Sequence, residues 1–315
     1  MLRHALALAA SFVGIALVAC SGDDGGASIT PEAACDDASA AYCAKIDECA
    51  TFFIKLGFGD RATCETRFKI NCVQGFSANG TSATPSRLSQ CATDAKAMSC
   101  EDIVGRKLPE SCKVLPGALA DGSPCGVDAQ CKGRLCRQAS GGSCGACSTL
   151  GAAGGACERD EDCDSELTCI EKKCVSFAKA GQPCSATTPC LRTLACNKGT
   201  CATPIAAGAA CEPNVDQSMN PCDAAKGGLF CHGQTKVCTA VGTAAAGAAC
   251  GFVDGNIVLC TAGGNCKTTP PAVSGSCQAA AADGAACDDT NGPKCLAPAR
   301  CLSGVCKISD PSSCK

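Results

Sequence analysis

Large hydrophobic side chains are concentrated in one short part of the chain. Six of the nine Phe and Tyr residues that follow the N-terminal leader lie between Tyr42 and Phe76. Helix-start signals come before these positions: Thr30-Pro31-Glu32 offers a capping hydroxyl, a proline at the first helical position and an acid in the first turn. The pattern predicts a helix from Pro31 to about Ala50, followed by an apolar connection over 52–58.

Two further helix starts follow in the same region. Asp60 can cap a helix over 61–76, and Thr84-Pro85 opens a helix that reaches about Met98. Residues 99–105 are expected to add a fourth, short turn. Residues 30–116 are therefore predicted to form a helical domain with eight cysteines, namely Cys35, Cys43, Cys49, Cys64, Cys72, Cys91, Cys100 and Cys112.

Cysteines on two antiparallel helices should pair so that the two residue numbers of each pair have a nearly constant sum. This rule favours Cys43–Cys72 and Cys49–Cys64 as a two-rung ladder between the first and second helices. The other four cysteines of the domain then pair among themselves, in an order that the sequence leaves open.

The pattern changes at Gly117, after which Gly, Ala, Pro and Cys dominate and large side chains are rare. Residues 154–174 and 181–201 share the frame G-x-x-C-x5-C-x3-L-x-C-x4-C, which marks an internal repeat. Short Lys-Gly and Ser-Gly segments before the last cysteine suit tight turns between two very short strands. We expect six repeats, over residues 117–150, 151–177, 178–204, 205–240, 241–279 and 280–315.

Four cysteines in a repeat allow three connectivities. Pairing of the first with the third and the second with the fourth is favoured, because interlocked loops can hold a unit that has almost no hydrophobic core. Cys147 and Cys314 break the frame: they could pair with each other if the array curls back, pair locally after reshuffling, or bridge to another chain. The favoured pairs in the most regular repeats are Cys157–Cys169, Cys163–Cys174, Cys184–Cys196, Cys190–Cys201, Cys287–Cys301 and Cys295–Cys306.

Composition and the N-terminus predict that these disulfides form outside the cytosol. The chain has 35 cysteines among 315 residues, a share above the roughly 8–10% that marks a disulfide scaffold. Residues 1–19 have the charged start and apolar run of a signal peptide, and the run is too short for a comfortable transmembrane span. Removing Cys20 leaves an even number of cysteines, which suits full pairing in an oxidising compartment.

The segment Leu17-Val18-Ala19-Cys20 resembles the bacterial lipobox. The resemblance implies that Cys20 is lipidated and becomes the first residue of the mature protein, with residues 20–29 as a polar tether to the membrane. An ordinary signal peptide without lipidation is the alternative.

The repeats resemble the Dickkopf N-terminal-type cysteine-rich repeats of predicted lipoproteins from myxobacteria and their relatives. The resemblance covers most of the mature chain and implies an exported, membrane-anchored lipoprotein of the outer membrane or cell surface. The expected fold is small and disulfide-rich, with a helical N-terminal disulfide domain followed by an elongated array of cysteine-rich repeats with short β-hairpins.

Candidate chemistry is sparse along the chain. Cys144-Gly-Ala-Cys147 is a C-x-x-C, but its flanks favour structural half-cystines over a redox or zinc site. His232 is the single histidine after the leader, and Asn79-Gly80-Thr81 is a turn that also matches a glycosylation sequon. An acidic cluster could hold calcium, but its spacing favours a solvated loop, as at Asp288-Asp289. The cluster comprises Glu158, Asp160, Glu161, Asp162, Asp164 and Glu166.

A net charge of −3 gives no reason to expect a nucleic-acid partner, and no cofactor motif occurs. The sequence thus favours a non-enzymatic, lipid-anchored scaffold for extracellular binding or adhesion, with an unknown protein or glycan as partner. The alternative is a secreted-type protein inhibitor or toxin-like ligand, displayed on the long loops Cys211–Cys231 or Cys250–Cys260. A passive spacer and an enzyme that depends on His232 are weaker hypotheses.

Overall fold

The computed structural model describes residues 28–138, 142–213, 220–269 and 271–315. Both predicted helix caps form, because Thr30 accepts the N–H of Ala33 and Asp60 accepts that of Thr63. The first helix is longer than predicted, since it continues through the expected connection with a kink at Ala50. The described α-helices are α2 (Pro31–Gly57), α3 (Arg61–Phe76), α4 (Pro85–Ala97) and α5 (Cys100–Val104), followed by the 3-10 turn η1 (Glu110–Cys112).

The helices bury the large side chains that the sequence concentrates in this region. Tyr42 and Ile46 of α2 share one buried cluster with Phe58 and with Ile103 of α5. The ring centroids of Tyr42 and Phe68 are 4.7 Å apart, so aromatic packing joins α2 to α3. Full burial of a side chain of this size stabilises a fold by about 1.5–3 kcal/mol. The helical region therefore has an ordinary hydrophobic core.

The disulfides of the helical region differ from the predicted ladder, and the predicted pairs Cys43–Cys72 and Cys49–Cys64 are wrong. The structure instead joins Cys35 to Cys72 and Cys43 to Cys64. The two cysteines on α2 are as far apart in sequence as the two on α3, so both disulfides join the facing surfaces of the helices. The shorter step from Cys43 to Cys49 turns Cys49 about a third of a turn away from that surface. The pairs in the structure are Cys35–Cys72, Cys43–Cys64, Cys49–Cys100 and Cys91–Cys112.

Short strands, nearly all antiparallel, make up the repeats. The second, third, fourth and sixth repeats each hold one hairpin, the first has strands in the order β1-β3-β2, and the fifth has the order β10-β12-β11-β14-β13. The turns Lys198-Gly199 and Ser303-Gly304 have positive φ at both residues, as two-residue hairpin turns require. The strands are β1 (Pro124–Cys125), β2 (Arg134–Gln138), β3 (Gly145–Thr149), β4 (Leu167–Ile170), β5 (Lys173–Ser176), β6 (Ala195–Asn197), β7 (Thr200–Ala202), β8 (Leu229–Cys231), β9 (Cys238–Ala240), β10 (Gly242–Ala244), β11 (Ala249–Val253), β12 (Asn256–Cys260), β13 (Asn265–Thr268), β14 (Ser274–Gln278), β15 (Arg300–Leu302) and β16 (Val305–Lys307).

One glycine and one carbonyl close each repeat. The glycine that opens the G-x-x-C segment has a φ between 76° and 85° in every repeat, a region that disfavours other residues. Its N–H donates to the carbonyl of the last cysteine of the same repeat, or to that of Cys306 in the sixth repeat, where Cys314 follows, at 2.7–2.9 Å. In the first repeat this partner is Cys147, which is therefore the fourth cysteine of that repeat. The six glycines are Gly122, Gly154, Gly181, Gly208, Gly247 and Gly284.

Every repeat joins its first cysteine to its third and its second to its fourth, which is the connectivity favoured from the sequence. This includes Cys157–Cys169, Cys163–Cys174, Cys184–Cys196, Cys190–Cys201, Cys287–Cys301 and Cys295–Cys306. The first, fourth and fifth repeats follow the same order, with Cys125–Cys136, Cys131–Cys147, Cys211–Cys231, Cys222–Cys238, Cys250–Cys266 and Cys260–Cys277.

The surplus cysteines join the two ends of the array. Cys144 bonds to Cys314 across a sequence separation of 170 residues, while Cys147 bonds locally to Cys131. Two of the alternatives left open by the sequence therefore apply together. The array curls back, and within the first repeat Cys147 takes the place of Cys144 as the partner of Cys131.

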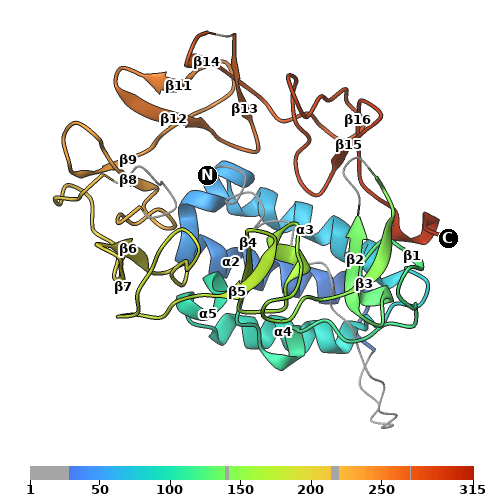
Figure 1. The fold of residues 1–315 in the computed structure, drawn as a ribbon. Coiled ribbons are helices and arrows are strands. Elements are labelled where there is room, and N and C mark those ends of the chain that lie inside the picture. Colours follow the sequence, from blue (N-terminus) through green and yellow to red (C-terminus); the bar gives the residue numbers. More distant parts are fainter. Residues whose placement is uncertain (1–27, 139–141, 214–219, 270) are drawn as a thin grey trace.

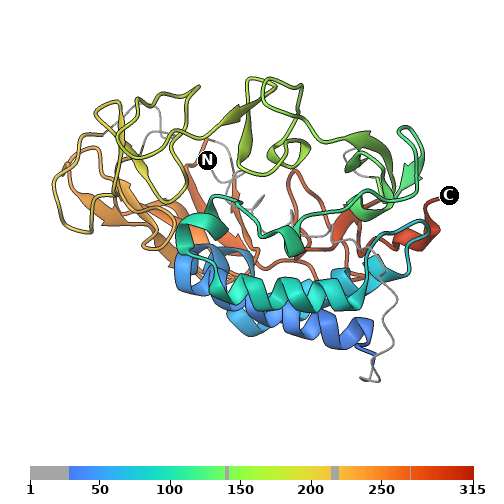
Figure 2. The ribbon, with the colours of Figure 1, turned by 90° about the horizontal axis from the view of Figure 1, so that it is seen from below.

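The repeats curve over the helices, so the prediction of an elongated array is wrong. Figures 1 and 2 show the helices in one layer, with the repeats arching over it and the C-terminus beside the first repeat. Backbone hydrogen bonds tie the first repeat to the turn after α3 (Ala118 N–H to Gly80 C=O, 3.0 Å) and the fifth repeat to the end of α2 (Gly263 N–H to Leu56 C=O, 2.7 Å). These contacts could not be read from local sequence.

Within the described ranges, no helix combines the length and apolar character needed to cross a membrane. The predicted signal peptide, residues 1–19, and the predicted lipidation site, Cys20, lie outside these ranges, as does most of the 20–29 tether.

Candidate functional site

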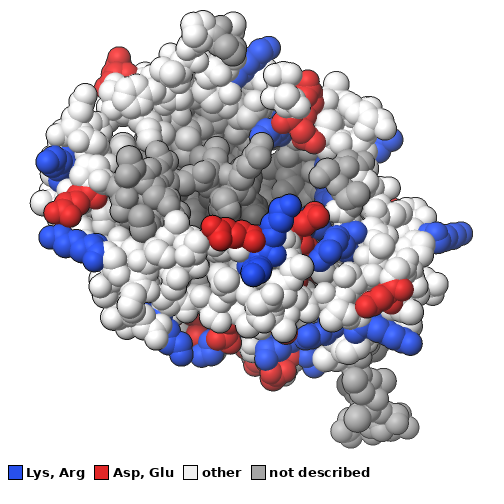
Figure 3. Space-filling model, in the orientation of Figure 1, with Lys and Arg blue, Asp and Glu red and all other residues white. Residues whose placement is uncertain are grey.

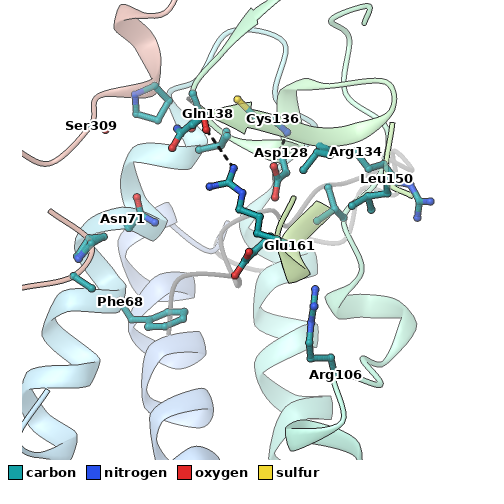
Figure 4. Close-up of a pocket in the computed structure, with 18 of the residues that line it drawn as sticks. Phe68, Asn71, Arg106, Asp128, Arg134, Cys136, Gln138, Leu150, Glu161 and Ser309 are labelled. Atoms are coloured by element: carbon teal, nitrogen blue, oxygen red, sulfur yellow. Dashed lines mark hydrogen bonds between the residues drawn. The ribbon is translucent and has the colours of Figure 1, made fainter. Parts of the chain in front are cut away.

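A cavity of about 500 Å³ lies between the helical layer and the repeats. Its floor comes from α3 and from the segment after α5, and its walls come from the first, second and last repeats (Figure 4). Figure 3 shows basic and acidic side chains interspersed over β4 and β2 on this face of the molecule. The charged residues that line the cavity are Arg67, Arg106, Lys113, Asp128, Arg134, Arg159, Glu161, Asp164 and Arg300.

Arg67 fixes the last repeat to α3. Its guanidinium donates to both carboxylate oxygens of Asp283, at 2.6 and 2.8 Å, and also to the backbone carbonyls of Leu296 and Ala297, at 2.9 and 2.8 Å. A bidentate guanidinium–carboxylate pair has a strict geometry. Arg67 therefore positions the loop before β15, which carries Arg300 into the cavity wall.

Asp128 and Asp160 occupy the same place in the first and second repeats, each three residues after the first cysteine. Both start 3-10 turns, η2 (Asp128–Gln130) and η3 (Asp160–Asp162). Asp128 accepts the N–H of Cys136 at 2.6 Å, and Asp160 accepts the corresponding N–H of Cys169 at 2.9 Å. The acid at this position thus ties the first loop of the repeat to its third cysteine.

The two equivalent acids nevertheless have opposite pKa shifts. Desolvation raises the pKa of Asp128 to about 6, against the lowering effect of the hydrogen bond from Cys136. Burial would raise the pKa of Asp160 as well, but hydrogen bonds from Thr168 and Cys169 and the Arg192 guanidinium lower it overall. Arg192 lies 2.6 Å from Asp160. Asp128 is therefore the carboxyl of this site that changes its protonation near neutral pH.

Three guanidinium groups at the cavity are weakly neutralised. Arg106 donates to the backbone carbonyl of Asp160 at 2.9 Å, and Arg159 lies 3.7 Å from the buried carboxylate of Asp162. Burial is the main cause that lowers the pKa of both Arg106 and Arg300, and neighbouring arginines add to the effect. The site therefore concentrates positive charge where water is partly excluded.

Glu161 supplies negative charge to the same space. Its charge favours the charged forms of Arg106 and Arg300. In Figure 4 Glu161, Arg106 and Asp128 extend into the cavity from three separate segments of the chain.

A second, apolar cavity adjoins this one. It lies among α2, α3 and α4 and shares Phe68, Leu108 and Val127 with the first cavity. The site thus has a charged end at the repeats and an apolar end at the helices. Such a combination suits ligands that have both characters.

The acidic cluster of the second repeat is only partly the solvated loop that the sequence favours. Glu158 and Glu166 are exposed, but Asp160 and Asp162 are buried. Asp162 accepts the N–H of Glu158 at 2.8 Å and lies 3.6 Å from Arg137. These carboxylates are engaged by N–H groups and guanidiniums, which is a structural role. Asp288 is similar, because it accepts the N–H groups of Thr290 and Asn291.

The other sequence candidates lie apart from the cavity. Cys144 and Cys147 belong to two different disulfides, so they form no dithiol pair. Groups of three cysteine sulfurs, such as Cys157, Cys163 and Cys174, lie within 4.8 Å of one another in the repeats, but each of these sulfurs is held in a disulfide. His232 contacts the carbonyl of Gly255 at 3.1 Å, in the fourth repeat.

The arginines of the cavity were not singled out from the sequence. Arg67, Arg106 and Arg300 have no common spacing and come from segments far apart in the chain. Among the charged lining residues, Glu161 and Asp164 carried a signal as members of the acidic cluster, and Arg159 as their neighbour. Comparison with known proteins finds no matching family model, no matching curated protein and no matching solved structure.

Proposed function

We propose that this protein is an exported, lipid-anchored and non-enzymatic binding protein, and that its binding site is the cavity between helices and repeats. The leader and the lipobox-like segment ending at Cys20 support export and anchoring. The single observation that carries the binding role is the cavity, whose volume of about 500 Å³ lies within the roughly 300–1,000 Å³ of small-molecule sites.

The chemistry of the lining supports binding without turnover. Among the described lining residues there is no histidine, and the two cysteines, Cys136 and Cys163, are both held in disulfides. A nucleophile paired with a base is the usual requirement for covalent catalysis. The disulfide frame supports a rigid site, which lowers the entropy cost of binding.

The test uses the protein isolated from the membranes of cells that express the full chain. Mass spectrometry of the N-terminal peptide should show a lipid on Cys20, and native mass spectrometry should show a retained small molecule. Ser165→Trp fills part of the cavity lining and should abolish retention, whereas Ser176→Trp, exposed in the same repeat and outside the lining, should leave it unchanged. Retention by the Ser165→Trp variant would contradict the proposed site.

A secreted-type inhibitor remains the second candidate, because one observation favours it. Phe252 and Val273 are 53% and 69% exposed, and the Phe252 N–H donates to the Val273 carbonyl at 3.0 Å. Two exposed large apolar residues thus lie on adjacent segments of backbone, and Phe252 belongs to the Cys250–Cys260 loop named from the sequence. Part of the Cys211–Cys231 loop, residues 214–219, lies outside the described residues. Loss of protease inhibition in Phe252→Ala would support this candidate.

A further inference from the structure

Arg300 differs from the other arginines that line the cavity. Its guanidinium makes no ion pair and no hydrogen bond with any residue that the structure describes, whereas Arg67, Arg106, Arg134 and Arg159 each have at least one such partner. Arg300 is nevertheless partly buried. A desolvated cation without a bonded partner is costly to a fold, and a ligand that neutralised it would remove this cost.

The groups around Arg300 add to the positive charge. Arg159 is close enough to lower the pKa of Arg300 by repulsion, while Glu161 is the acid that favours its charged form. Arg159 itself is held loosely, 3.7 Å from Asp162 and 3.5 Å from the carbonyl of Gln138. Arg159 and Arg300 both line the cavity. Among the described residues, Arg300 has no ion-pair partner and the carboxylate paired with Arg159 lies 3.7 Å away, so neither guanidinium has a close bidentate carboxylate that would compete with a bound oxyanion.

Another part of the lining is apolar. Phe68 and Leu108 line both the charged cavity and the apolar cavity beneath it, together with Val127. A ligand that reached from Arg300 to Phe68 would therefore place a charged group among arginines and an uncharged group against a ring and aliphatic side chains.

We infer that the cavity binds a small amphipathic organic anion, whose carboxylate or phosphate oxygens are held by Arg300 and Arg159 and whose apolar part lies against Phe68. The planar guanidinium fork matches both oxyanions. This inference rests on the proposed function, because it takes the cavity as the binding site. It adds the chemical class of the ligand.

Isothermal titration calorimetry of the mature protein tests the inference with hexanoate, hexyl phosphate and 1-hexanol. The two anions should bind more tightly than the alcohol, and their order distinguishes a carboxylate site from a phosphate site. Arg300→Ala should weaken binding of the better anion by about tenfold or more, the loss expected for a charged hydrogen bond. Lys307→Ala is the matched control, because Lys307 faces Arg300 in the β15–β16 pair and lies outside the lining; it should leave the affinity within about twofold.

Arg300→Lys separates an effect on binding from an effect on folding. Lysine keeps the positive charge and the aliphatic part of the side chain but lacks the planar guanidinium that can donate two parallel hydrogen bonds. The unfolding midpoint of this variant should match that of the parent, while its affinity for the anion falls. Equal affinity for 1-hexanol and hexanoate would overturn the anion assignment and leave the cavity as a binding site. Undiminished hexanoate binding by Ser165→Trp would overturn the assignment together with the proposed function.

Discussion

The helical region and the repeats contain the same kind of cross-link but use it differently. In the helical region, Cys43–Cys64 adds to a cluster that already contains Tyr42, Ile46 and Phe58. In the second repeat the buried cluster consists of Cys157, Cys163, Cys174 and a single large side chain, Leu167. The disulfides reinforce a hydrophobic core in one region and constitute the core in the other.

The stability of the two regions therefore has different physical sources. A small unit buries too little apolar surface to offset its conformational entropy, and cross-links restrict the unfolded chain instead. The helices should therefore keep much of their structure in reductant, and the repeats should not.

Removal of one disulfide from each region should have the largest effect. Cys163→Ser with Cys174→Ser, and Cys43→Ser with Cys64→Ser, should each cost on the order of 3 kcal/mol from loop entropy. The first pair should also abolish hydrogen-exchange protection throughout residues 157–174, because the remaining Cys157–Cys169 bridge and Leu167 bury too little to hold the unit. The second should leave α2 and α3 protected. Equal loss of protection in both regions would contradict the contrast.

Truncation of an apolar side chain should cost more stability in the helical region than in the repeats, the reverse of the effect of disulfide removal. Ile103 is only 1% exposed within the helical core, so Ile103→Ala should destabilise that region by about 2–4 kcal/mol. Leu167→Ala in the second repeat should cost only about 1–2 kcal/mol, because the cystines around it stay in place. Urea titrations followed by far-UV circular dichroism and by exchange of the repeat amides would measure the two costs.

Replacement of Asp128 should produce a smaller, pH-dependent effect. Its pKa in the folded protein is about 6, above the ordinary value of 3.8. The folded state therefore holds the proton more tightly than the unfolded state, and stability falls as the pH rises from about 4 to about 6. Asp128→Asn keeps an oxygen for the Cys136 N–H without the charge. At pH 7 it should raise the free energy of unfolding by about 1–2 kcal/mol, and this gain should disappear near pH 4.

Asp160→Asn is the matched comparison for this effect. The pKa of Asp160 is lowered in the folded protein, so its charged form contributes stability above its ordinary pKa, and that contribution is lost at acid pH. The Asp160 variant should be less stable than the parent at pH 7. At pH 7 the thermal unfolding midpoints of the two variants should shift in opposite directions from the parent, and the rise for Asp128→Asn should vanish at pH 4. Shifts of the same sign at pH 7 would disprove the assignment.

Removal of the ion pair that links the helical region to the last repeat should have the smallest effect on stability. Arg67 and Asp283 form a bidentate pair between α3 and the last repeat, and Asp283 is partly exposed. A double-mutant cycle with Arg67→Ala and Asp283→Ala should give a coupling energy of about 1 kcal/mol. A coupling near zero would mean that the last repeat is held to α3 mainly by the neighbouring carbonyl contacts of Arg67.

Local features of this fold could be predicted, and features set by distant contacts could not. The caps at Thr30 and Asp60, the hairpin turns and the connectivity of each regular repeat depend on neighbouring residues. The predicted helical disulfides are wrong because a nearly constant sum of residue numbers does not ensure that both pairs lie on the facing surfaces of the helices. Cys35 with Cys72 and Cys43 with Cys64 take equal steps along both helices, and that equality was a usable signal in the sequence.

The closure of the array and the cavity had no such signal. Gly228 packs against Phe52, and Arg67 binds Asp283, but neither contact joins residues that are near in sequence. The cavity arginines come to line one site only when four segments that are distant in sequence come together in the fold. A single sequence therefore predicted the repeating unit and not the way in which the units assemble.

The bond between Cys144 and Cys314 has a mechanical consequence. Tension applied between the two ends of the chain would cross this covalent link, so residues 148–313 would lie outside the covalent load path. The hairpins of the second to sixth repeats would carry no tension along this covalent path, and the extensible length would be at most that of the residues before Cys144, which the disulfides of the helical region and of the first repeat shorten further. The protein is thus arranged so that a stretching force spares the walls of its own cavity that come from the second and last repeats.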